Sequence, residues 1–212
     1  ISTGRDGRVL VHCHAGCSPE NVVAAIGLKL ADLMPPAEHH AARPGKLVAR
    51  YQYRDETGTV LFEAVRYDHP KDFKVRRPNG SGEWIANLKR TRRVLYRLPE
   101  LLAANPQDIV YIVEGEKDGD RLHSLGLCAT TNVSGAGKWK PEYSETLRER
   151  HVVILPDNDE AGREHARKVA ASLRGKAATV KVVALPDLPP KGDVSDWLDA
   201  LHTVDELVSL VR

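Results

Sequence analysis

The chain has 212 residues, of which 42% are hydrophobic and 28% are charged, and its formal net charge at pH 7 is +2. This composition is ordinary for a globular protein, and it excludes a disordered or low-complexity chain. No apolar run approaches the roughly 18 to 20 residues that a membrane helix needs, and no signal-peptide pattern opens the chain. We therefore expect a cytoplasmic protein without a membrane partner.

A turn rich in cysteine and histidine follows the first strand-like run, GRVLVHCHAGC. Cys13 and Cys17 lie in this turn. Ser18 then has the character of a helix N-cap, with Pro19 at the first helical position. We expect an apolar helix that runs through Ile26.

Cysteine usage indicates metal binding or reduced thiols, because Cys13 and Cys17 are clustered and Cys128 is far away. The stretch MPPAEHHAARPG, residues 34–45, contains three prolines and no hydrophobic periodicity, which is typical of a linker. The first residue is Ile1 and not methionine, so we expect a fragment, a processed product or a chain without its first residues.

The middle of the chain has the pattern of a basic, β-rich unit. The strand-like runs LVARYQY, TVLFEAVRY and FKVRR are separated by turn signals at DETG and PNGSG, which predicts a small and mostly antiparallel sheet. Residues 46–99 hold thirteen basic and six acidic residues, whereas residues 100–212 hold fourteen basic and nineteen acidic ones. This contrast indicates an electropositive surface for a polyanion beside a carboxylate-rich site.

Basic and aromatic residues are interleaved in this middle segment. Phosphates attract such charge, and exposed aromatic rings stack on unpaired bases at about 1 to 3 kcal/mol each. A charge run is also typical of a solvated face, but we expect a path for single-stranded nucleic acid here. The residues expected along it are Arg76, Arg77, Arg92, Arg93 and Arg97, with Tyr67, Phe73, Trp84 and Tyr96 among them.

From residue 108 onward, short apolar runs alternate with helical patterns. The runs IVYIV, LCATT, VVILP and ATVKVVAL read as strands, and KDGDRLHSLG, PEYSETLRER and EAGREHARKVAASL read as helices. This alternation predicts βαβ units and a parallel sheet. In such sheets ligands bind beyond the carboxyl ends of the strands.

Acidic residues follow three of these predicted strands. Glu114 follows the first, Asp157 and Asp159 follow the third, and Asp193 and Asp196 follow the fourth. Carboxylate oxygens are the ligands that Mg²⁺ prefers, and two residues at i and i+2 of an extended segment point to the same side. We therefore expect a metal site against phosphate. The alternative is local, with Asp159 as a helix cap and Asp157 as a turn residue.

The stretch SGAGKW is not a phosphate-binding P-loop, because the required glycine is replaced by Asn132 and the required Ser or Thr by Trp139. This pattern excludes an ATPase of that class. We expect Lys138 either to reach a phosphate near the acidic cluster or to be a solvated loop lysine.

Glu114, Gly115 and Asp118, followed about forty residues later by Asp157 and Asp159, resemble the TOPRIM domain of bacterial-type primases, topoisomerases and several nucleases. The resemblance covers about residues 108–200. DNDEAGREHA is similar to the primase form, and GDVSDWL is similar to the third acidic motif of that family. The resemblance implies an α/β fold. This fold is a Rossmann-like parallel sheet flanked by helices, and a small, mostly antiparallel β-rich subdomain precedes it.

Two further stretches resemble phage and plasmid primases: VLVHCHAGCSPENVVAAIGL looks like the second half of their zinc-binding domain, and RVLYRLPELLAA like the segment before the TOPRIM strand. We therefore expect a partial zinc-binding segment and linker at 1–45, a basic subdomain at 46–107 and a TOPRIM domain at 108–212.

Structural zinc needs four ligands, and the first Cys/His pair of that domain is absent from this sequence. Cys13 and Cys17, with His14 or His12 nearby, supply half of a site. The alternatives are a remnant without zinc, or a site completed by a separate chain or by the histidines His39 and His40.

The resemblance implies the catalytic core of a DNA primase that makes short RNA primers on a single-stranded DNA template during phage or plasmid replication. Mg²⁺ or Mn²⁺ would be held by Glu114, Asp157 and Asp159, and ribonucleoside triphosphates would be the substrates. No helicase segment is visible, so a separate replicative helicase is the expected partner. The supporting acidic residues would be Asp118, Asp193 and Asp196, and the phosphate-binding lysines would be Lys117 and Lys138.

Two other functions remain open from the sequence. A TOPRIM nuclease would use the same carboxylates to activate water against a phosphodiester. A non-catalytic remnant would bind single strands in a salt-dependent way without metal-dependent chemistry. A topoisomerase is disfavoured, because the chain has little room for a domain with a catalytic tyrosine.

Overall fold

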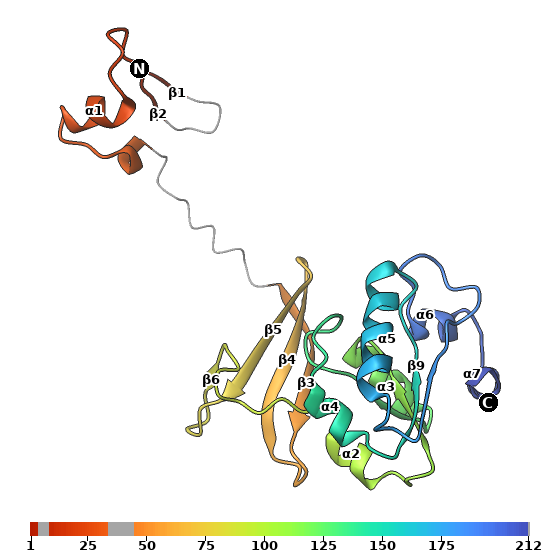
Figure 1. Ribbon diagram of the computed structural model, residues 1–212. Helices are drawn as coiled ribbons and strands as arrows, with labels where there is room; N and C mark the ends of the chain where they lie inside the picture. Colours follow the sequence, from red (N-terminus) through yellow and green to blue (C-terminus); the bar gives the residue numbers. More distant parts are fainter. Residues whose placement is uncertain (4–8, 34–44, 212) are drawn as a thin grey trace. The chain divides into compact units, whose positions relative to one another are not determined.

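The computed structural model describes residues 1–3, 9–33 and 45–211. The chain forms two compact units, Ile1–Gly45 and Lys46–Arg212 (Figure 1). In the described residues no helix combines the length and the apolar character that a membrane span requires.

The first unit is small. Strands β1 (Ser2–Thr3) and β2 (Val9–Leu10) pair antiparallel, and helix α1 (Pro19–Ala24) and a 3₁₀ helix η1 (Leu30–Leu33) follow. The expected start of α1 is confirmed, because the Ser18 side chain accepts a hydrogen bond from the Asn21 amide and Pro19 opens the helix.

Helix α1 ends at Ala24, before the predicted end at Ile26. Gly27 has a φ of +75°, and its amide donates to the Ala24 carbonyl while the Leu28 amide donates to the Val23 carbonyl. These two bonds form a glycine C-cap that stops the helix. Ile26 therefore leaves the apolar face and is 64% exposed.

The second unit begins with a four-stranded sheet in the order β3-β4-β5-β6, in which all neighbours are antiparallel. The predicted antiparallel sheet is thus confirmed. Its strands are β3 (Lys46–Arg54), β4 (Val60–Asp68), β5 (Asp72–Pro78) and β6 (Trp84–Ile85).

A parallel sheet in the order β10-β9-β7-β8 follows, as the alternating pattern predicts. Its strands are β7 (Ile109–Ile112), β8 (Cys128–Thr130), β9 (His151–Ile154) and β10 (Thr179–Val182). The helices are α2 (Leu98–Ala103), α3 (Glu116–Ser124), α4 (Pro141–Thr146), α5 (Glu160–Leu173), α6 (Val194–Asp199) and α7 (Val204–Val211).

The two sheets share one apolar core. Val110 and Ile112 of β7 face the cluster that also holds Tyr53 and Phe62 of the antiparallel sheet. Tyr111, which alternates with them, faces a second cluster under α3, α6 and α7. The expected domain boundary between residues 107 and 108 falls inside this unit and stays a prediction.

The strand order places a crevice at the carboxyl ends of β7 and β9. The chain moves from β7 to β8 on one side, then crosses to β9 and β10 on the other, so the order reverses between β7 and β9. Ligands bind at such a reversal in open α/β sheets. Glu114 and Asp157 follow these two strands.

Candidate active site

A cavity of about 350 Å³ lies at this reversal point. We call it the acidic cavity, because its lining includes the carboxylates of Glu114, Asp118, Asp157 and Asp193. Residues of the antiparallel sheet and of its β4–β5 loop complete the lining, so the cavity lies where the two sheets of the second unit meet. These residues are Tyr51, Arg66, Lys71 and Phe73.

Glu114 has a carboxylate oxygen without a hydrogen-bond partner among the described residues. This oxygen, Oε1, is buried. Burial raises its pKa, and the nearby charges of Asp159 and Asp118 raise it further. Gly162 of α5 faces it closely, since a Cβ at that position would collide with the Oε1 atom of Glu114.

Asp157 follows β9 and shares this environment. Burial raises its pKa to about 8, and repulsion from Glu114 and Asp118 adds to the effect. A carboxyl group with so high a pKa is mostly protonated at neutral pH in the absence of a cation. The cavity therefore has more carboxyl groups than its lysine and arginine side chains could balance if all of these groups were ionised.

Lys117 lies between two of the carboxylates. Its Nζ is 2.8 Å from Oδ2 of Asp193 and 3.6 Å from Oδ1 of Asp118. Burial raises the pKa of Asp118 to about 6, although the Ser195 hydroxyl donates to it. Burial would also raise the pKa of Asp193, but the hydrogen bond from Lys117 and amide donors hold it below its ordinary value.

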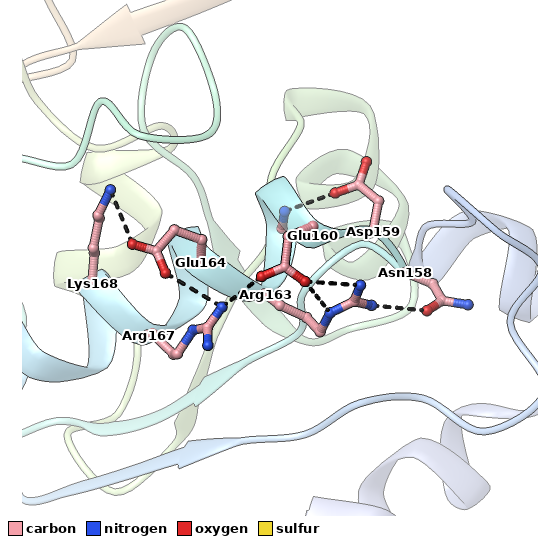
Figure 2. A network of polar contacts seen from close by, with 8 residues as sticks. Asn158, Asp159, Glu160, Arg163, Glu164, Arg167 and Lys168 are labelled. Carbon is pink, nitrogen blue, oxygen red and sulfur yellow. Dashed lines mark hydrogen bonds and ion pairs between the residues drawn. The ribbon is translucent and has the colours of Figure 1, made fainter.

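Asp159 does not line the acidic cavity with Asp157. It is the N-cap of α5, and its Oδ1 accepts a hydrogen bond of 2.8 Å from the Gly162 amide (Figure 2). Because β9 ends at Ile154 and the Asp159 amide donates to the Asp157 carbonyl, the two aspartates lie in a turn and not in an extended segment. The Asp159 charge nevertheless lies near enough to raise the pKa values of Glu114 and Asp157. The expectation that both aspartates face one metal site stays a prediction. The local alternative, a helix cap, describes Asp159.

The exposed face of α5 beyond this cap carries a chain of ion pairs (Figure 2). Glu160 contacts Arg163 and Arg167, and Glu164 contacts Arg167 and Lys168. Exposed pairs of this kind contribute about 0 to 1 kcal/mol each, so they support the helix without shaping the cavity.

Asp196 also serves a helix start. Its Oδ2 accepts from the Asp193 amide, and its own amide donates to Oδ1 of Asp193, which forms a capping box on α6. Asp196 is exposed and does not line the acidic cavity. Its role is to hold Asp193 in place next to Lys117.

Lys138 lies on the loop after β8, outside the lining of the acidic cavity. Gly135 and Gly137 have φ values of +62° and +74° in this loop. The Gly137 amide donates to Nδ1 of His165, a residue 3% exposed on α5. A Cβ on Gly135 would lie 3.8 Å from the Glu114 carbonyl, so the loop passes close to the acidic cavity.

The five arginines expected along one path are spread over several surfaces, although Arg92 and Arg93 line one cavity together. Arg76 and Arg77 point to opposite faces of β5 because successive strand residues alternate. Arg92 pairs with Glu56, Arg97 pairs with Asp120, and Arg93 donates to the Thr91 carbonyl. A second cavity of about 450 Å³ holds Arg92 and Arg93 together with Lys89, Arg90 and Lys140.

The sequence reasoning missed Tyr51, Arg66 and Lys71 as lining of the cavity, and it expected Phe73 on the nucleic-acid path. Arg66 and Phe73 lie opposite each other on β4 and β5 and reach the acidic cavity, as does Lys71. Glu116 is also buried, and it accepts a 2.7 Å hydrogen bond from the Tyr53 hydroxyl while burial raises its pKa. No local pattern predicts that Arg66 and Phe73 reach the cavity, because strand register brings them there.

In the first unit, Cys13 and Cys17 are free thiols on the turn after β2. Amide donors of Cys17 and Ala15 lower the pKa of the Cys13 thiol. The rings of His12 and His14 lie 5.0 Å apart, edge to face. His39 and His40 lie outside the described residues.

Among the described residues, no group of three or more His, Cys, Asp or Glu side chains is already arranged to hold a metal ion. The donor set nevertheless fits a hard cation. The Glu114 oxygen lacks a partner, the carboxyl groups of Asp157 and Asp118 have raised pKa values, and every candidate ligand is an oxygen.

Residues 111–201 match the family model described as Toprim-like. This stretch of the chain is similar to the Toprim-like family. A relative from Mycobacterium phage D29, the Gene 57 protein, is 38% identical over 77 residues, which cover 36% of this chain and 47% of that protein. The matched stretch thus spans less than half the length of that curated relative.

Solved primase structures share the fold of this Toprim-like stretch and of the sheet before it. The primase fragment of the bacteriophage T7 primase-helicase protein matches with a TM-score of 0.54 and 21% identity over 77% of this chain and 61% of that chain. The E. coli primase catalytic core matches with a TM-score of 0.57 and 21% identity over 93% of this chain and 61% of that one. The chain therefore has the fold of primase catalytic cores, which confirms the expected fold and resemblance.

Proposed function

We propose that Lys46–Arg212 is the catalytic core of a DNA primase of phage or plasmid type, which makes short RNA primers on single-stranded DNA. The observation that carries this proposal is the acidic cavity, where carboxylates at the ends of β7 and β9 face Arg66 and Lys71. Carboxylates opposite cations suit a metal-bound triphosphate. The shared fold of primase cores supports the same function.

Glu114, Asp157 and Asp159 would hold Mg²⁺ or Mn²⁺, with Asp118, Asp193 and Asp196 in support. When bound, the ion would neutralise phosphate charge and lower the barrier to attack by a 3′-hydroxyl. Asp159 retains one carboxylate oxygen that does not take part in its helix cap, because only Oδ1 accepts a hydrogen bond from the Gly162 amide.

Zn²⁺ at Cys13, Cys17 and His14 stays a separate proposal for the first unit.

The cationic residues around the acidic cavity would bind the ribonucleoside triphosphate. Arg66 and Lys71 approach from the antiparallel sheet and its β4–β5 loop, and Lys117 already bridges two carboxylates. Lys138 would reach the phosphates from the adjacent glycine-rich loop. Phe73 lines the cavity and is 51% exposed, so its ring is available to stack on a base.

The second cavity, lined by Lys89, Arg90, Arg92, Arg93 and Lys140, would bind the backbone of the template. Arg77 and Arg97 would act from neighbouring surfaces of the same unit. A replicative helicase is the proposed partner, since unwinding supplies the single-stranded template.

The deciding experiment incubates the protein with labelled single-stranded DNA, ribonucleotides and Mn²⁺. Primer synthesis predicts short RNA products that Asp157→Asn abolishes and that Asp199→Asn, an exposed carboxylate at the end of α6, leaves intact. Shortened DNA would favour the nuclease alternative, in which the same carboxylates activate water. Binding without either product would favour the non-catalytic alternative.

A further inference from the structure

The antiparallel sheet has an outer face that the apolar core does not use. Residues opposite each other on antiparallel strands share a face, so Arg50, Val65 and Lys74 form one row across β3, β4 and β5. Gln52, Glu63 and Arg76 form the next row on this face. Tyr53 and Phe62 point the other way, into the core.

Basic and aromatic side chains are paired on this outer face. The Lys74 ammonium lies 5.5 Å from the centre of the Tyr67 ring, and the Arg76 guanidinium lies 4.8 Å from the centre of the Trp84 ring. Trp84 is 37% exposed although it is a large apolar side chain. An exposed ring beside a fixed cation is a platform for an unpaired base.

A buried carboxylate fixes the position of one of these cations. Glu63 is 1% exposed and accepts a 2.6 Å hydrogen bond from Nε of Arg76. Val65, in the neighbouring row of this face, is also 1% exposed. The guanidinium of Arg76 is therefore held between Glu63 and the Trp84 ring rather than moving freely in solvent.

At the β3 edge of this face lies a third cavity of about 360 Å³. Its cations are Arg50, Arg54 and Arg97, and its one carboxylate is Glu100. Arg50 is exposed and has no hydrogen-bond or ion-pair partner among the described residues. The basic surface thus continues from β5, across β4, to the β3 edge.

We propose that this outer face, defined by Arg50, Tyr67, Lys74, Arg76 and Trp84, binds a second length of single-stranded nucleic acid away from the acidic cavity. Its net positive charge complements phosphates, and its aromatic rings suit unpaired bases, which a duplex or a protein partner does not offer. Arg66 and Phe73, which line the acidic cavity, belong to the opposite face of the sheet. A nucleic-acid strand bound to the outer face therefore does not occupy the acidic cavity.

This inference rests on the proposed nucleic-acid function but not on its metal-dependent chemistry, so binding is measured in EDTA. The probe is a fluorescent oligothymidylate, titrated with the full chain at several salt concentrations. The double variant Arg50→Ala/Lys74→Ala should bind more weakly, because it neutralises two fewer phosphates. Its log-log salt slope should be smaller by about 1.4, at about 0.7 for each phosphate that is no longer neutralised.

The matched control is Arg167→Ala/Lys168→Ala, which removes the same two charges from the exposed face of α5. Its affinity and salt slope should match those of the unchanged chain, apart from the small general effect of removing two positive charges. Equal behaviour of the two double variants would overturn the proposal. Unchanged affinity with a lowered melting temperature in the Arg50/Lys74 variant would show that these side chains stabilise the fold and do not bind nucleic acid, which also overturns the proposal.

Tryptophan fluorescence tests the stacking platform directly. Trp197 is 2% exposed and Trp139 packs against the core, whereas Trp84 is 37% exposed, so bound oligonucleotide should quench mainly Trp84. Quenching should disappear in Trp84→Phe, and Trp84→Ala should weaken binding about tenfold. Quenching that persists in Trp84→Phe would place the bases elsewhere and contradict the proposal.

Discussion

At the scale of single residues, the missing side chain of Gly162 decides how closely α5 approaches the acidic cavity. A Cβ there would collide with Oε1 of Glu114 and would lie 2.7 Å from the Asp157 carbonyl oxygen. Alanine favours a helix by about 1 kcal/mol over glycine, which offsets part of the cost of shifting the Asp157 backbone. We expect it to displace Glu114 and to reduce metal-dependent synthesis at least about tenfold, which primer assays measure.

Gly119 on α3 is the matched control for this substitution. It is also a helical glycine, but an added Cβ would meet its neighbours at ordinary distances, the nearest 3.6 Å away on Tyr96. Gly119→Ala should keep full activity and melt at the same or a higher temperature. If Gly162→Ala also keeps full activity, then primer synthesis does not depend on the present position of the Glu114 side chain.

At the scale of one element, the turn after β2 tests the proposed zinc site. Structural zinc needs four protein ligands, and Cys13, Cys17 and one histidine supply at most three in the described residues. We expect less than one zinc per molecule by elemental analysis, and none in Cys13→Ser/Cys17→Ser. A polypeptide that supplies the missing Cys/His pair should raise the zinc content to one. One tightly held zinc without it would point to His39 or His40 as the further ligand.

At the scale of the whole molecule, the acidic cavity should make folding depend on pH. The folded pKa values of Asp157 and Asp118, about 8 and about 6, lie above the ordinary value of 3.8. The folded state therefore binds more protons than the unfolded state between about pH 4 and pH 8. Their contribution to stability is complete below pH 4 and is lost as pH rises through 6 to 8. Melting temperatures in EDTA should fall across this range.

Asp157→Asn should flatten this decline between pH 6 and pH 8, whereas Asp199→Asn should not. Added Mg²⁺ should restore the melting temperature near pH 8, because a cation replaces the bound proton. Parallel curves for the unchanged chain and Asp157→Asn would show that Asp157 ionises without cost. The acidic cavity would then have no electrostatic need for a cation.

The sequence by itself determined the elements whose signals are local. Hydrophobic periodicity located the strands of both sheets except the short β6, and it located the helix at 160–173. Ser18 with Pro19 marked the start of α1. The strand-end rule also predicted that Glu114 and Asp157 come together, because parallel strands end at one edge of their sheet. Their catalytic roles stay predictions.

Only the tertiary structure decided the features that depend on long-range pairing. Asp159 became the N-cap of α5 and does not line the cavity with Asp157, because β9 ends before it and the chain turns. The arginines separated, because strand alternation splits Arg76 from Arg77 and partners distant in sequence, such as Glu56, hold others. The register between β-strands is set by the packing of entire sheet faces. No single stretch of sequence therefore encodes which cationic side chains meet the carboxylates of the acidic cavity.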